Sequence, residues 1–326
     1  MHPICNVGAG FAAPAHRQPS CNRLCGLTAA ATLSLALLAG TAEAHVVCGK
    51  RFFPATLTMD DPGVGDELSL PTVQYLPIPA SDAAPGGHSI DYGYEFDKRI
   101  TEDLGIAING NYFTQHGVGQ NLHGWDNTTL TLKDQLPCSE THEFVASIGV
   151  VRELARTGSS LLRDAGAIDS TSFTAPTLYA GKGLGDLPIG VFRPLAVTGE
   201  LSYQFSDTPS ISPNQWNWAV SVQYSMPYLQ QSVKALDIPD FLTRFVPLVE
   251  IAYSAPAHGV PTGTIAPGLL YEGGTWQAGV EALIPANAAT RQGQGVGFIA
   301  QFHLYFDDLF PTTLGKPIFG TNLWGR

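Results

Sequence analysis

Apolar and polar residues alternate with period two along most of the chain after residue 44. The stretch 197–206 alternates apolar or glycine positions with Thr, Glu, Ser and Gln, and the stretches 216–225 and 295–306 show the same period. Each run is about ten residues long, which is the length of a β-strand that crosses a bilayer at a tilt. No apolar run of 18 residues follows residue 44, so a membrane-spanning helix is not expected. The pattern predicts long β-strands with one apolar face.

Twelve such runs can be placed, and the segments between them are of two kinds. The connections after odd-numbered runs are long and polar, whereas several after even-numbered runs are tight, as at 100–102 and 273–274. This order predicts an all-β fold, an antiparallel up-and-down transmembrane β-barrel with long outer loops, short periplasmic turns and both termini in the periplasm. The exception is 226–243, where a short amphipathic helix is expected. The predicted strands are 66–76, 88–99, 103–113, 122–135, 141–154, 174–184, 194–206, 215–225, 244–254, 263–272, 275–285 and 295–307.

A soluble β-sandwich also alternates, but two features favour the membrane barrel. Sandwich strands average about 5–6 residues, roughly half the length of these runs. Aromatic residues also gather at both ends of the runs, as the interfacial girdles of a membrane barrel do. They are Tyr75, Tyr92, Tyr112, Tyr203, Phe205, Trp216 and Tyr253 at the outer ends, and Tyr224, Tyr271, Trp276 and Phe306 at the inner ends.

The first 44 residues have the features of a secretory signal peptide. Arg17 and Arg23 precede the uncharged stretch 27–39, and the small residues at 42 and 44 form an A-x-A cleavage site ahead of His45. We therefore expect cleavage after Ala44 and location in the outer membrane of a Gram-negative cell. The expected organisation is a signal peptide (1–44), a periplasmic N-terminal segment (45–65), the barrel (66–307) and a periplasmic C-terminal tail (308–326).

Composition excludes several other classes of protein. Only 14% of residues are charged, and 35 Gly and 24 Pro are present, which disfavours a helical bundle. The formal net charge is -11, so no nucleic-acid partner is expected. The expected partners are outer-membrane lipids and the barrel assembly machinery. Because about twenty residues follow Phe306, that machinery would read an internal signal around 297–306.

Four stretches resemble a proteobacterial outer-membrane β-barrel family that is largely uncharacterised and whose members are often labelled transporters, alongside the phenol meta-pathway barrels. They are CGKRFFPATLTMDDPGVGDELSLPT (48–72), YEFDKRIT (94–101), TLYAGKGLGDLPI (177–189) and FIAQFHLYFDDLFPTTLGKPIFG (298–320). The resemblance covers most of 45–320. It implies an outer-membrane barrel, and it assigns neither a substrate nor a functional residue.

The polar faces of the predicted strands converge on a lumen that carries more acids than bases. Eight acids against three bases indicate a hydrated, acidic interior, because buried carboxylates otherwise need partners. A channel that passes small polar or cationic solutes is the leading hypothesis. A plugged barrel that does not conduct stays open as the alternative. The residues are Glu95, Asp97, Asp103, Glu143, Glu200, Glu250, Glu272 and Glu281, with Lys133, Arg99 and Arg244 as counter-charges.

Two cysteines remain after signal cleavage and enter an oxidising compartment. A disulfide between Cys48 and Cys138 is expected to pin the N-terminal segment across the periplasmic mouth. The weaker alternative is a copper or zinc site made of these two cysteines with His45 and His142. A structural or accessory barrel that binds a metal or a periplasmic partner would follow from that alternative.

Catalytic motifs are absent from the sequence. None of the nine histidines is followed by Ser two residues later, the spacing that would place both side chains on one strand face. We therefore expect neither an enzyme nor a cofactor, and a membrane enzyme without a recognisable motif is the weakest of the alternatives.

Overall fold

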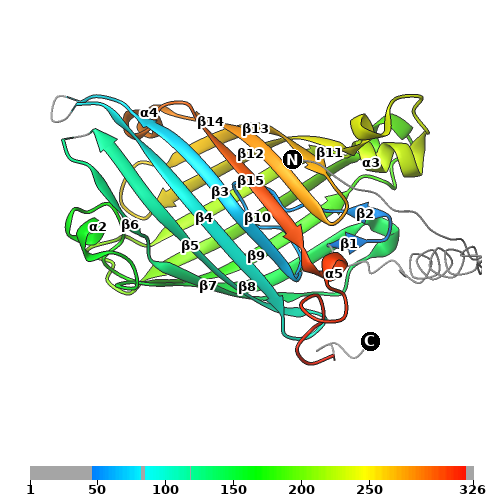
Figure 1. Cartoon of the computed structure of the whole chain (residues 1–326), viewed down its shortest axis with the longest axis horizontal. Coiled ribbons are helices and arrows are strands. Elements are labelled where there is room, and N and C mark those ends of the chain that lie inside the picture. Colours follow the sequence, from blue (N-terminus) through cyan, green and yellow to red (C-terminus); the bar gives the residue numbers. More distant parts are fainter. Residues whose placement is uncertain (1–45, 82–84, 118, 321–326) are drawn as a thin grey trace, which may run out of the picture. The chain divides into compact units, whose positions relative to one another are not determined.

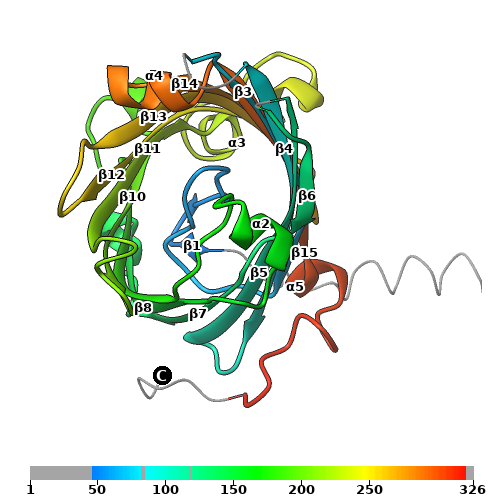
Figure 2. The same cartoon turned by 90° about the vertical axis from the view of Figure 1, so that its left-hand side faces the viewer.

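The computed structural model describes residues 46–81, 85–117 and 119–320, and these form a closed antiparallel β-barrel (Figures 1 and 2). Neighbouring strands are consecutive along the chain, β15 pairs with β3, and the remaining β3–β4 and β4–β5 pairings complete the ring. The barrel strands are β3 (Glu67–Ile78), β4 (Gly87–Arg99), β5 (Leu104–Gly117), β6 (Leu122–Trp125), β7 (Thr128–Gln135), β8 (Phe144–Leu154), β9 (Phe173–Gly183), β10 (Leu195–Ser206), β11 (Gln215–Tyr224), β12 (Phe245–Pro256), β13 (Thr262–Glu272), β14 (Trp276–Pro285) and β15 (Gly297–Tyr305).

The short strands β6 and β7 are two parts of one barrel strand, because both pair with β5 and only residues 126–127 separate them. The barrel therefore has twelve strands, which confirms the prediction from the sequence. The expected signal peptide lies outside the described residues.

The connections between strands form two groups, one at each end of the barrel, as predicted. One end carries the longer loops, including α2 (Ser160–Asp164) and α4 (Ala288–Gly293), and we call it the loop end. The other end carries the turns, with η2 (Glu140–His142), η3 (Gly190–Phe192) and α5 (Phe306–Leu309), and we call it the turn end. No helix within the described ranges is both long and apolar enough to cross a bilayer.

The connection 225–244 contains three short helical pieces instead of one amphipathic helix. These are α3 (Met226–Tyr228), the π-helical η4 (Leu229–Val233) and the 3-10 helix η5 (Asp240–Arg244). Ser225 caps α3 by accepting a hydrogen bond from the Tyr228 backbone N–H.

The outer wall of the barrel is apolar, and aromatic rings form two levels on it. At the loop end, Trp218 stacks on Tyr253 with ring centroids 5.0 Å apart. At the turn end, Trp276 stacks on both Tyr271 and Phe302, with centroids 5.6 Å apart in each pair. Large apolar side chains between these levels are exposed, as Leu178 is at 57%. Such a surface suits a lipid environment, because exposed apolar patches of this extent are rare on soluble monomers.

Residues 46–66, which we call the inner segment, fold into the barrel instead of lying outside its mouth (Figure 2). The segment starts with the hairpin of β1 (Val47–Cys48) and β2 (Arg51–Phe52), near the turn end. Leu57 packs in a buried apolar cluster with Val246, Leu248, Ala266, Leu270, Leu283 and Ile299. The apolar and hydrogen-bonding groups of this segment thus find their partners inside the barrel, and its expected place on the periplasmic side stays a prediction.

Candidate functional site

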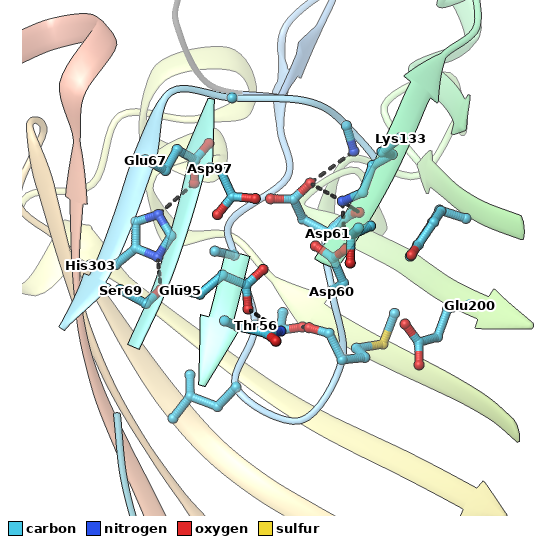
Figure 3. Close-up of a pocket in the computed structure, with 18 of the residues that line it drawn as sticks. Thr56, Asp60, Asp61, Glu67, Ser69, Glu95, Asp97, Lys133, Glu200 and His303 are labelled. Carbon is cyan, nitrogen blue, oxygen red and sulfur yellow. Dashed lines mark hydrogen bonds and ion pairs between the residues drawn. The ribbon is translucent and has the colours of Figure 1, made fainter. Parts of the chain in front are cut away.

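A central cavity of about 310 Å³ lies between the inner segment and the barrel wall (Figure 3). Residues 55–61 form one side of it, and residues from β3, β4, β5, β7, β8, β9, β10 and β15 form the other. Its ionisable lining is mostly acidic. The acidic residues are Asp60, Asp61, Glu67, Glu95, Asp97 and Glu200, and the basic ones are Lys133 and His303.

Lys133 fixes the position of the inner segment in this cavity. Its Nζ lies 2.7 Å from Asp60 Oδ2 and 3.9 Å from Asp61 Oδ1, and it donates a hydrogen bond of 3.1 Å to the Asp61 carbonyl. The same ammonium group lies 4.6 Å from the centre of the Tyr179 ring, within the range of a cation–π contact. One base therefore serves several carboxylates, and the cavity keeps an excess of acidic groups.

A second cavity, of about 380 Å³, lies toward the loop end and shares Leu57, Glu95, Asn109 and Gln301 with the central one. Three further carboxylates line it, from Asp91, Asp126 and Glu153. Amide groups hold two of them, since Gln74 donates to Asp91 at 3.2 Å and Asn127 donates to Glu153 at 3.0 Å. The described residues that line this cavity include no Lys, Arg or His.

A third cavity, of about 480 Å³, lies on the other side of the barrel, against β10–β13 and α4. It shares Thr58 and Glu200 with the central cavity, and the rest of its lining is mainly Thr, Ser, Asn, Gln, Ala and Gly residues. The inner segment therefore lies between a carboxylate-rich cavity and one with few charges, and both adjoin the central cavity.

Glu250 is a predicted lumen residue whose role is to hold the inner segment. Its carboxylate accepts hydrogen bonds from the Thr58 backbone N–H at 2.7 Å and from the Thr58 hydroxyl, and the residue has no exposed surface. Glu281 is also buried, and it lies close enough to Glu250 for a hydrogen bond between the two carboxyl groups. These two acids are therefore structural contacts and do not line the three cavities described above.

Glu143 anchors the inner segment at the turn end. Its carboxylate accepts hydrogen bonds from Arg51 Nε at 3.2 Å, from the Tyr228 hydroxyl at 2.6 Å and from the Gly185 N–H at 3.1 Å. Arg51 is fully buried, donates to the carbonyls of Arg193 and Pro194, and stacks on the Tyr228 ring at 3.8 Å. Four separate parts of the chain thus meet at this ion pair.

Two predicted counter-charges lie outside the lumen. Arg244 lies in the exposed 3-10 helix η5, where it pairs with Asp240. It does not point into the lumen with the polar face of β12, because that strand begins only at Phe245. Arg99 pairs with Asp66 and Asp307 at the turn end. Asp103 lies in the turn 100–103, and the partly buried Glu272 is the last residue of β13, so neither lines the cavities above.

Ser69, His303 and Glu67 form a buried hydrogen-bonded chain on the wall of the central cavity. Ser69 Oγ lies 2.7 Å from His303 Nδ1, and His303 Nε2 lies 2.5 Å from Glu67 Oε2. Ser69 and His303 are direct partners in the register of β3 and β15. A search for His and Ser along one strand could not find this chain, because its members come from strands at opposite ends of the sequence.

Cys48 and Cys138 lie next to one another with free thiols. Burial, reinforced by the neighbouring Cys138 thiol, raises the pKa of the Cys48 thiol to about 12, which disfavours the thiolate that a metal would need. His142 is exposed and pairs with Asp186 at 3.4 Å, and His45 lies outside the described residues. Within the described ranges, no cluster of three or more His, Cys, Asp or Glu side chains could hold a metal ion.

Comparisons with known proteins give matches among solved structures alone. No family model matches the chain, and no curated protein is significantly similar to it. The KdgM porin is 14% identical, with a TM-score of 0.43, and the match covers 72% of this chain and 99% of that one. The COG4313 outer membrane channel from Pseudomonas putida F1 is 10% identical, with a TM-score of 0.48, covering 78% of this chain and 100% of that one. OmpF of Salmonella typhi, in complex with daunomycin, is 10% identical with a TM-score of 0.29, covering 74% and 96%.

Proposed function

We propose that the protein is an outer-membrane channel for the passive passage of small polar or cationic solutes. The observation that carries the proposal is the excess of carboxylates in a polar lumen. The central and loop-end cavities share Glu95 and together are lined by nine acidic residues, with Lys133 and His303 as the basic ones. A lumen lined in this way attracts cations and repels anions. The apolar outer wall with its two aromatic levels supports location in a membrane.

The inner segment narrows the path and selects for small solutes. It separates cavities of about 310–480 Å³, which is the volume range of sites for small organic molecules. The inner segment is held to the barrel wall by polar contacts with Lys133 and Glu250, and the cavities lie on both sides of it. A solute therefore passes beside the segment, close to Glu95 or Glu200.

The chain of Ser69, His303 and Glu67 has the order of a nucleophile, a base and an orienting carboxylate. Acyl transfer also needs donors for a developing oxyanion, whereas the ionisable residues that line the cavity beside Ser69 are mostly carboxylates, which repel such a charge. We therefore assign these residues to the polar wall of the lumen and propose no catalytic step. Wild-type protein and a Ser69→Ala variant should show the same background rate of ester hydrolysis.

Ion selectivity tests the channel function. A unit charge about 5 Å from a passing ion contributes about 0.8 kcal/mol in a water-like dielectric, which is roughly a fourfold change in preference. Because each carboxylate favours a cation and disfavours an anion by this amount, replacing both Glu95 and Glu200 by Gln should lower the ratio of cation to anion permeability by up to about fifteenfold for each charge removed. Reversal potentials of the purified protein in a planar bilayer, under a salt gradient, measure this ratio.

The matched control is Asp240→Asn, which removes one negative charge from the exposed turn η5 and leaves the lumen unchanged. This variant should keep the wild-type reversal potential. An unchanged reversal potential in the Glu95→Gln, Glu200→Gln variant would reject the acidic path, even if the protein conducts.

A further inference from the structure

A groove of about 590 Å³ crosses the outer wall of the barrel on β5 and β7–β11. Two rows of outward-facing side chains border it. Pairs of opposite residues in the strand register define the first row from Leu104 on β5 to Leu201 on β10. The first row is Leu104, Asp134, Ile148, Leu178 and Leu201, and the second is Leu132, Val150, Pro176, Tyr203 and Trp216.

The length and direction of this groove suit one extended acyl chain. The first row spans five neighbouring strands, and four gaps of about 4.8 Å make it about 19 Å long. One leaflet of the bilayer core is about 15 Å thick. Because barrel strands tilt by about 35–45°, a row that runs across them rises obliquely through the membrane. Leu104 begins β5 at the turn end, and Trp216 lies at the loop end of β11, so the groove starts near the turn-end interface.

Asp134 gives this apolar groove one charged position. The neighbouring Lys133 points into the lumen, and alternation along β7 therefore turns Asp134 outward. Its Oδ1 is buried and has no hydrogen-bond partner among the residues that the structure describes, and the described groove lining contains no other Asp or Glu and no Lys, Arg or His. A carboxylate on the lipid face without a partner is costly, and the cost falls if a cation from the membrane lies beside it.

We propose that this groove binds a phospholipid with a primary ammonium headgroup, of the phosphatidylethanolamine type. The acyl chain lies between the two rows, and the ammonium group pairs with Asp134 at the turn-end interface. Charge complementarity selects the headgroup, since phosphatidylglycerol offers a hydroxyl in place of the ammonium and repels the carboxylate through its net negative charge.

Native mass spectrometry of the folded protein in detergent micelles tests the proposal with phosphatidylethanolamine and phosphatidylglycerol of identical acyl chains. The wild-type protein should retain phosphatidylethanolamine at least about fivefold more tightly, because one ion pair at about 4 Å in a water-like dielectric contributes about 1 kcal/mol. Asp134→Asn should lower this preference to near unity. Asp237→Asn, which removes an exposed carboxylate elsewhere at the turn end, should leave the preference unchanged.

The groove itself is tested separately from the charge. Val150→Trp fills it and should weaken retention of both lipids, whereas Val222→Trp, on the outer face of β11 beyond the groove, should not. Each variant is first checked for the heat-dependent gel shift of a folded barrel. Equal retention of the two lipids by wild-type protein, or an unchanged preference in Asp134→Asn, would overturn the proposal. These outcomes are independent of whether the lumen conducts ions.

Discussion

Replacing Arg51 by Met should release the inner segment from the turn end. The guanidinium is fully buried and bonds to Glu143 and two backbone carbonyls. Removing one partner of a buried ion pair costs about 3–5 kcal/mol, because the remaining charge stays desolvated without compensation. The opening free energy of residues 46–66 should fall by about this amount. Amide hydrogen exchange measures it locally, for example at the Phe53 N–H, which bonds to the Val46 carbonyl at 3.0 Å.

A double-mutant cycle separates the ion pair from the loss of packing. Glu143→Gln in the Arg51→Met background removes the unpaired charge and should recover about 1–3 kcal/mol of the loss. Arg244→Met is the control, because Arg244 and Asp240 form an exposed pair of the kind that contributes about 0–1 kcal/mol. If Arg51→Met lowers protection of the inner segment no more than Arg244→Met does, the segment is not anchored by this ion pair.

Three further predictions concern the termini and the membrane. Cys48 and Cys138 lie next to one another as thiols, and an oxidising periplasm should join them. Thiol alkylation under denaturing, non-reducing conditions should then find a disulfide in protein from the cell envelope, and two free thiols would reject the bridge. Burial raises the pKa of Asp307 to about 9 despite the neighbouring Arg99, so the folded state binds this proton more tightly and loses stability as pH rises from about 4 to 9. Asp307→Asn should flatten the pH dependence of proteolysis in 308–320, and an unchanged profile would contradict this. The folded protein should migrate faster on a gel without boiling, and recovery in a detergent-free soluble fraction would exclude the membrane barrel.

The strands could be predicted from the sequence because their environment leaves a direct pattern. A barrel wall between lipid and a polar interior forces period two over its whole length, and most predicted strand ends agree with the structure within three residues. The prediction of Arg244 in the lumen is wrong, because it extends the alternation of β12 to a residue that precedes the strand. Local alternation thus identifies a strand face but does not show where that face begins.

The inner segment could not be predicted because its contacts are distant in sequence. Thr58 and Glu250 are separated by 192 residues in the sequence. Asp60 pairs with Lys133 of β7, and the sequence alone does not place the inner segment next to that strand. Adjacent acids such as Asp60 and Asp61 are typical of turns, so their role in the cavity has no local signal. Glu67 and His303 do lie on the polar faces of predicted strands, and the β3–β15 pairing that closes the barrel brings them together.

Single-channel recording of the purified, folded protein in a planar bilayer shows whether the barrel conducts. We predict discrete conductance steps with cation preference, because polar cavities remain on both sides of the inner segment and most of their charged lining residues are acidic. Protein that inserts in folded form but gives no current above that of the lipid alone would contradict the channel function and favour the plugged, accessory barrel.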